Sequence, residues 1–128
     1  MQVERSNLIL GALLGGTAVV LGALGSHAFF AAGADPKLIN AWDVGVRYQA
    51  WHALALLALA PLERRVGGGA LPWLFGIGVL GFSGSLYLLA LEVLPDGLGV
   101  VTPIGGVVLI AGWLLLFGRA LRMGAERA

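Results

Sequence analysis

Two histidines interrupt the apolar stretches of this sequence, and they are the residues best suited to metal or proton chemistry. His27 and His52 lie in separate apolar segments, where two imidazoles could act as axial haem ligands. Two ligands do not make a zinc site, and there is no cysteine to supply thiolates. Ser26 and His27 are adjacent and point apart on a helix, which disfavours a nucleophile–base pair. We therefore expect interhelical hydrogen bonds for both histidines, with no catalytic residue, metal or cofactor.

Ten polar side chains from the four apolar segments are candidates for a shared site. An ionisable side chain at bilayer depth costs roughly 2.5–3.5 kcal/mol on insertion scales, so each one needs a reason to be there. One interpretation is a polar pocket open to the outer side of the membrane. The other, which we favour, is a hydrogen-bond network that fixes how the helices align. The candidates are His27, Arg47, Tyr48, Gln49, His52, Ser83, Ser85, Tyr87, Glu92 and Thr102.

Two of these candidates carry opposite charges at similar expected depths. Arg47 and Glu92 both lie towards the outer ends of their segments, and each charge alone would bear the cost of insertion. The sequence therefore predicts an ion pair between them. Asp43, four residues before Arg47 on the same helix face, is the rival partner.

The composition of the whole chain is that of an integral membrane protein. The chain has 128 residues, of which 59% are hydrophobic and only 12% are charged. A soluble domain has about 25% charged residues and needs them to cover its surface. This composition excludes an ordinary soluble globule and a disordered chain. The net charge of +1 also argues against a nucleic-acid partner.

Four apolar segments are long enough to cross a bilayer. About 20 helical residues span a hydrocarbon core of about 30 Å. The links between the segments are short, so neighbouring helices must be antiparallel. The first segment resembles a signal peptide, but its apolar run exceeds the usual length of about 7–15 residues, so we expect it to be retained. We predict an all-α membrane protein, a single four-transmembrane-helix antiparallel bundle over 1–128, with helices at about 8–31, 38–62, 71–94 and 98–121.

The distribution of basic residues predicts the orientation of the bundle. Cytoplasmic loops carry an excess of Lys and Arg. The two termini and the 63–70 link hold six arginines, whereas the opposite side holds Lys37 and Arg47. We therefore expect both termini to be cytoplasmic. The six arginines are Arg5, Arg64, Arg65, Arg119, Arg122 and Arg127.

Glycines recur at helical spacing in three of the segments. Small residues let helix backbones approach closely, which drives packing where burial of apolar surface cannot. We expect these grooved faces to pack within the bundle, although they could also serve a partner or a second copy of the chain. The glycines are Gly11, Gly15, Gly22, Gly25, Gly78, Gly81, Gly105 and Gly112.

Four motifs give the sequence a family resemblance. They are GALGSHA at 22–28, VRYQAWHALALLAL at 46–59, FSGSLYLLAL at 82–91 and TPIGGVVLIAGW at 102–113. In this order they resemble the YgdD-like family of small four-helix membrane proteins of unknown function. The resemblance implies a multi-pass protein of the bacterial inner membrane, and it supplies no activity or catalytic residue. It also implies that the polar residues of these motifs, and Pro103 in addition to them, matter to the family.

We expect a non-enzymatic membrane protein with a structural, partner-supporting or envelope role. The expected partners are membrane lipids and a homo-oligomer or another membrane protein. The alternative is an oligomeric small-solute transporter or channel, with a polar site in the outer half of the bundle. Four helices rarely enclose a water-filled path, so a pore would need several copies. A membrane enzyme or redox carrier that uses the histidines is the third interpretation.

Overall fold

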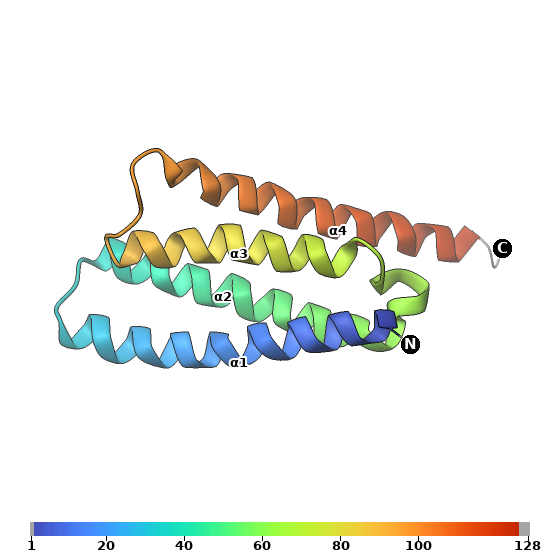
Figure 1. Ribbon diagram of the computed structural model, residues 1–128, viewed down its shortest axis with the longest axis horizontal. Coiled ribbons are helices and arrows are strands. Elements are labelled where there is room, and N and C mark those ends of the chain that lie inside the picture. Colours follow the sequence, from blue (N-terminus) through green and yellow to red (C-terminus); the bar gives the residue numbers. More distant parts are fainter. Residues whose placement is uncertain (1, 126–128) are drawn as a thin grey trace.

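The chain folds into four long helices that run along one axis. The computed structural model describes residues 2–125, and among these the side chains of residues 5–29 and 31–125. Each helix runs antiparallel to the next (Figure 1). The all-helical class expected from the sequence is confirmed. The helices are α1 (Gln2–Ala31), α2 (Pro36–Leu59), α3 (Leu71–Ala90) and α4 (Val101–Ala125).

The helices lie side by side in chain order and do not form a closed ring. α1 packs on α2, α2 on α3 and α3 on α4, while α1 makes only slight contact with α3. α1 and α4 occupy the two outer edges, and the start of α1, the end of α4 and the α2–α3 connection share one end (Figure 1). We call this the connection end. The apolar core between α2, α3 and α4 contains Leu56, Leu71, Phe75, Val79 and Leu109.

The second helix starts earlier and ends earlier than the expected span 38–62. The Asp35 carboxylate accepts a hydrogen bond from the Lys37 amide at 2.8 Å, and Pro36 occupies the first turn, so α2 begins at Pro36. Pro61 lacks an N–H and cannot continue the α-helical ladder. The chain instead forms a 3-10 turn over Ala60–Leu62 and a π-helical turn over Glu63–Gly67.

The other boundaries also differ from the apolar limits. α3 ends at Ala90 rather than 94, because Glu92 adopts the left-handed conformation, with φ of 58°, and stops the ladder. α4 begins at Val101 rather than 98, after a 3-10 turn over Leu98–Val100, and continues beyond 121. α1 likewise begins before residue 8. Polar residues that are good helix formers continue the helical hydrogen bonding beyond the apolar segments. The ends of an apolar segment therefore indicate where the hydrocarbon core ends, and the helix itself can be longer.

The surface between the helix ends is apolar, as a membrane requires. Three segments are long and apolar enough to cross a bilayer: Arg5–Phe29, Leu71–Ala90 and Leu98–Ala125. α2 is more polar, since it carries Asp43 and Arg47. Large apolar side chains cover the outside of the helices, as in a protein surrounded by lipid. The chain is an integral membrane protein.

The glycines of α1 face α2. A Cβ at Gly11 would lie 2.8 Å from Leu57 Cγ, and one at Gly25 would overlap the ring of Trp42. Gly15 and Gly22 lie opposite Ala53 and Val46. This stripe of small residues therefore forms an internal contact.

The glycines of α3 and α4 face each other. A Cβ at Gly81 would lie 3.3 Å from Gly105 Cα, and one at Gly78 would lie 2.8 Å from Leu109 Cγ. A Cβ at Gly112 would lie 2.6 Å from a ring carbon of Phe75. The two backbones approach so closely at Gly81 and Gly105 that no side chain fits between them.

Candidate functional site

Gln49 is the centre of a hydrogen-bond network that joins three helices. Its side chain is buried on α2, and its Nε2 donates to the Leu14 carbonyl at 2.9 Å and to Thr17 Oγ1 at 2.7 Å on α1. Its Oε1 accepts from the Tyr87 hydroxyl on α3 at 2.8 Å. Both donors of the amide are used. The network fixes the register of α1, α2 and α3 in a medium where an unpaired amide would be costly.

His52 links α2 to α4 through both ring nitrogens. Nδ1 lies 2.7 Å from the carbonyl oxygen of Tyr48, and Nε2 lies 3.0 Å from Trp113 Nε1. The indole can only donate, so Nε2 accepts and Nδ1 carries the proton that is donated to Tyr48. Phe75 closes the site with its ring centroid 5.2 Å from that of His52. In this arrangement neither nitrogen is available as a metal or haem ligand.

The remaining hydroxyls form separate contacts. Ser83 Oγ donates to the Gly45 carbonyl at 2.7 Å and so joins α3 to α2. Ser85 and Thr102 share a hydrogen bond of 2.5 Å between α3 and α4. Tyr48 packs its ring against Phe82, with centroids 4.6 Å apart. The structure thus distributes these groups over several helix contacts.

Three candidates lie apart from these contacts. His27, Arg47 and Glu92 are all exposed. Ala53 lies opposite Gly15, so the axial level of His52 is about 16 Å from that of His27. This register disfavours the two histidines as a ligand pair.

The expected ion pair between Arg47 and Glu92 is absent from the described residues. Gly45 packs against Ser83 and Tyr87, so Arg47 lies close to the axial level of Ser83. Glu92 comes nine residues later in the chain, which corresponds to roughly 13 Å along the axis. The prediction compared distances from the segment ends and did not include the register between α2 and α3, which sets the two side chains at different levels.

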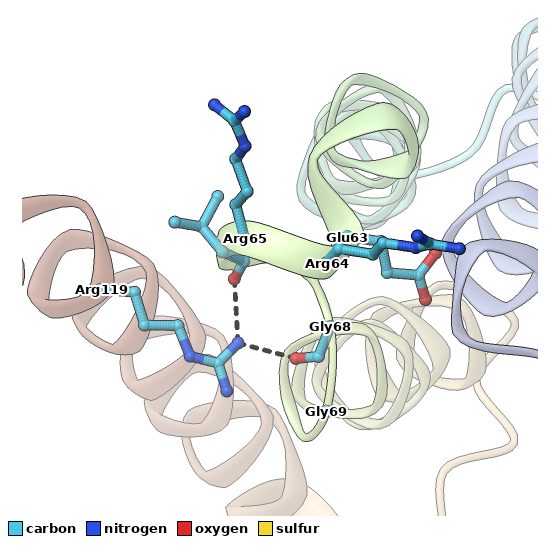
Figure 2. A pocket seen from close by; sticks show the side chains of 7 residues that line it. Glu63, Arg64, Arg65, Gly68, Gly69 and Arg119 are labelled. Atoms are coloured by element: carbon cyan, nitrogen blue, oxygen red, sulfur yellow. Dashed lines mark hydrogen bonds between the residues drawn. The ribbon is translucent and has the colours of Figure 1, made fainter. Parts of the chain in front are cut away.

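A second group of polar residues gathers at the connection end. A cavity of about 460 Å³ is lined by Glu63, Arg64, Arg65, Val66, Gly68, Gly69 and Arg119. Arg119 reaches across from α4 and donates through Nη1 to the carbonyls of Val66, at 2.9 Å, and Gly68, at 2.7 Å (Figure 2). In the same view the Glu63 carboxylate turns away from Arg119 towards α1.

Two buried residues beside this connection have unpaired oxygens. Glu63 is 3% exposed, and neither of its carboxylate oxygens has a hydrogen-bond partner. Asn7 is fully buried, and its Nδ2 donates to the Gly67 carbonyl at 2.9 Å while its Oδ1 is unpaired. Asn7 therefore ties α1 to the π-helical turn.

Several residues of these sites were not singled out in the sequence. Thr17 and Trp113 complete the networks of Gln49 and His52, and Trp42 donates to the Leu21 carbonyl at 2.8 Å. Thr17 is the only hydroxyl in the middle of its segment, which was an available signal. The two tryptophans look like ordinary apolar residues until a neighbouring helix supplies the acceptor.

Comparison with known proteins agrees with the geometry. Residues 21–106 match a family model described as a protein of unknown function, DUF423. The chain is 38% identical to the UPF0382 inner membrane protein YgdD of Escherichia coli K12, with 95% of this chain and 94% of that protein aligned. It is 38% identical to the UPF0382 membrane protein YwdK of Bacillus subtilis, with 90% and 95% aligned.

A relative from Staphylococcus haemolyticus, the UPF0382 membrane protein SH2409, is 40% identical over 85% of this chain and 89% of that protein. No solved structure matches the chain. The family model and the full-length relatives agree with the resemblance noted in the sequence motifs. The chain belongs to the DUF423 family of membrane proteins of unknown function.

Proposed function

We propose that this protein is a non-catalytic, four-span protein of the bacterial inner membrane that acts by associating with a second copy of itself within the bilayer. Both termini are placed in the cytoplasm. The support for this orientation is the excess of arginine at the connection end and the termini. Arg127, one of the six arginines in that count, lies outside the described residues.

The support for a fourth span is the position of α2. It packs between α1 and α3, both of which are long and apolar enough to cross. Its 24 residues extend about 36 Å, which matches its neighbours. A helix packed along its length between two spanning helices crosses with them.

The support for a non-catalytic role is the use of the interior polar groups. The amide of Gln49, the imidazole of His52 and the hydroxyl of Ser83 each make a hydrogen bond to a neighbouring helix. Groups engaged in this way hold helices in register and are not free to act on a substrate.

The observation that carries the proposal is the outward face of α2. Asp43, Arg47, Trp51 and Leu54 follow one another at spacings of four, four and three residues, and all four are exposed. Arg47 is the twelfth of the 24 residues of α2, so it lies near the middle of the membrane. No ion pair within the described residues neutralises Arg47 or Asp43. A charge at this depth costs roughly 2.5–3.5 kcal/mol.

A second copy related by a two-fold axis supplies the missing countercharges. Two parallel α2 helices in contact would place the Asp43 carboxylate of each copy about one turn, roughly 6 Å, along the axis from the Arg47 of the other. Two Asp43–Arg47 ion pairs form together, because a two-fold axis brings the same surface of both copies into contact. Another kind of partner would need its own matched charges.

A shallow groove beside this face lets a helix approach closely. It has a volume of about 370 Å³ between α1 and α2, and it is lined by Leu54 of the outward face and by the half-buried Ala50. Gly15, Ala18 and Ala53 form its small-residue walls. Small side chains favour helix contacts in lipid.

Charge-swap variants in liposomes test this proposal. Energy transfer between two labelled copies should fall in Asp43→Arg and in Arg47→Asp, because each homodimer then brings like charges together. Mixing the two variants should restore it, since each supplies the charge that the other needs. Lys37→Glu, at the end of the same helix, is the control and should have no effect. Equal transfer in all variants would contradict the proposed interface.

Flux measurements on the same liposomes test the alternative function, the passage of a small solute through an oligomer. Solute passage through the wild-type protein that Arg47→Ala abolishes would instead favour an oligomeric small-solute transporter or channel. A reporter that works only outside the cytoplasm, fused at the C-terminus, tests the orientation. Strong activity of that fusion would overturn the cytoplasmic placement of the termini.

A further inference from the structure

We infer that the arginine-lined cavity at the connection end is a binding site for the phosphate of an anionic phospholipid headgroup. This inference does not depend on the proposed self-association. It starts from the side chain of Arg119, which is held in place by the protein and has donors to spare.

Arg119 is preorganised by two hydrogen bonds from a single nitrogen. Nη1 uses both of its protons on the carbonyls of Val66 and Gly68. Nη2 and Nε retain three N–H donors, for which the described residues provide no hydrogen-bond partner. A guanidinium fixed in one orientation with free donors suits a phosphate, which it can bind in a bidentate manner.

The space next to these donors is open. Gly69 lies beside Nη2, and a Cβ on this residue would be 3.3 Å from that nitrogen. The glycine is present for its backbone, with φ of 64°, and its lack of a side chain also keeps the approach to Arg119 clear. The cavity of about 460 Å³ is large enough for a headgroup.

The charges around the cavity favour an anion. Three of the residues that line it are arginines. The Arg64 side chain extends towards α1 beside Glu63, whereas Arg65 is exposed and points away from Arg119 (Figure 2). Its flexible side chain can turn towards a ligand held by Arg119. Glu63 is the one acidic residue in the lining, and its carboxylate is turned towards α1, so it leaves the donors of Arg119 free.

The depth of the cavity selects a lipid rather than a soluble phosphate. Arg119 is the nineteenth residue of α4, about 27 Å along the helix from Val101. The hydrocarbon core is about 30 Å thick, so the Arg119 side chain reaches the level of the headgroups. At this level the negative charge of anionic lipid headgroups attracts basic side chains.

Native mass spectrometry of the full chain in detergent tests the site with phosphatidylglycerol and phosphatidylcholine of identical acyl chains. The wild-type protein should retain phosphatidylglycerol in preference. Arg65→Gln and Arg119→Gln should each retain about tenfold less, through loss of charge-assisted hydrogen bonds. Arg122→Gln is the matched control, because Arg122 is exposed on the same helix and does not line the cavity.

The outcomes separate a built site from diffuse charge. The Arg65 side chain makes no hydrogen bond among the described residues, so Arg65→Gln should retain the wild-type thermal stability and remains informative if Arg119→Gln unfolds. An equal loss of lipid in Arg65→Gln and Arg122→Gln would overturn the inference. Equal retention of the two lipids would also overturn it. Thermal stabilisation by inorganic phosphate, with no effect of phosphatidylglycerol, would overturn the lipid assignment.

Discussion

Replacement of Gly105 by alanine should separate α3 from α4 and destabilise the protein. A Cβ at this position would lie 2.8 Å from the carbonyl carbon of Gly81 and 2.9 Å from Phe82 Cα, and it would overlap the Phe82 amide nitrogen. All of these are backbone atoms of α3, so no rotamer change can make room. The helices themselves must move.

The size of the effect follows from the distances. Ordinary van der Waals contact begins near 3.4 Å, so the two backbones must separate locally by about 0.6 Å to clear the Gly81 carbonyl carbon, and by more to clear the Phe82 amide nitrogen. A gap of 0.5–1 Å already forfeits a quarter to a half of the dispersion attraction between facing atoms. Gly78 and Gly112 pack on the same helix pair and would lose contacts as well. We expect destabilisation by about 2–3 kcal/mol, towards the upper end of overpacking effects.

Equilibrium unfolding in mixed micelles would measure this effect, with two matched controls on α4. A Cβ at Gly106 would lie 3.6 Å from a ring carbon of Phe82, and one at Gly118 has nothing within 4 Å. Gly106→Ala and Gly118→Ala should therefore be neutral or slightly stabilising, since alanine favours helix. Equal stability of Gly105→Ala and Gly118→Ala would refute the close packing of α3 on α4.

Two further substitutions probe the polar contacts between helices. Gln49→Leu should destabilise the protein by about 1–3 kcal/mol in the same unfolding assay, because the Tyr87 hydroxyl and a carbonyl of α1 lose their partner. Asn40→Leu, which removes an exposed amide on the same helix, is the control, and an equal loss of stability there would show that the hydrogen bonds of Gln49 do not stabilise the protein. Trp113→Phe keeps the aromatic packing and removes the donor to His52 Nε2, so stability should fall by about 0.5–1.5 kcal/mol, and an unchanged unfolding curve would show that this hydrogen bond contributes nothing.

The amino-acid sequence determined the class of this protein and the approximate extent of its helices. Long apolar segments and scarce charge leave few options for a chain of 128 residues. The exact ends of the helices were predicted less accurately from the sequence, because they depend on individual residues such as Asp35, Pro61 and Glu92. A cap or a left-handed residue acts over one turn, whereas hydropathy averages over many residues.

Only the tertiary structure decided which polar residues meet. Gln49 and Tyr87 were both candidates in the sequence, but their pairing requires the particular register between α2 and α3. The same register keeps Arg47 and Glu92 apart. A rise of about 1.5 Å per residue means that an error of four residues at a helix end shifts a side chain by about 6 Å, enough to create or abolish a contact.

The spacing of the glycines shows which features of helix packing a sequence can predict and which it cannot. The periodic small residues indicated a grooved face on each of three helices, yet a groove accepts a neighbouring helix, a second copy or a lipid equally well. The depth of contact at Gly25 and Gly105 is set by what lies opposite, the ring of Trp42 in one case and bare backbone in the other. Sequence patterns fix the face of a helix because they are local, whereas the partner of that face depends on how distant segments of the chain pack together.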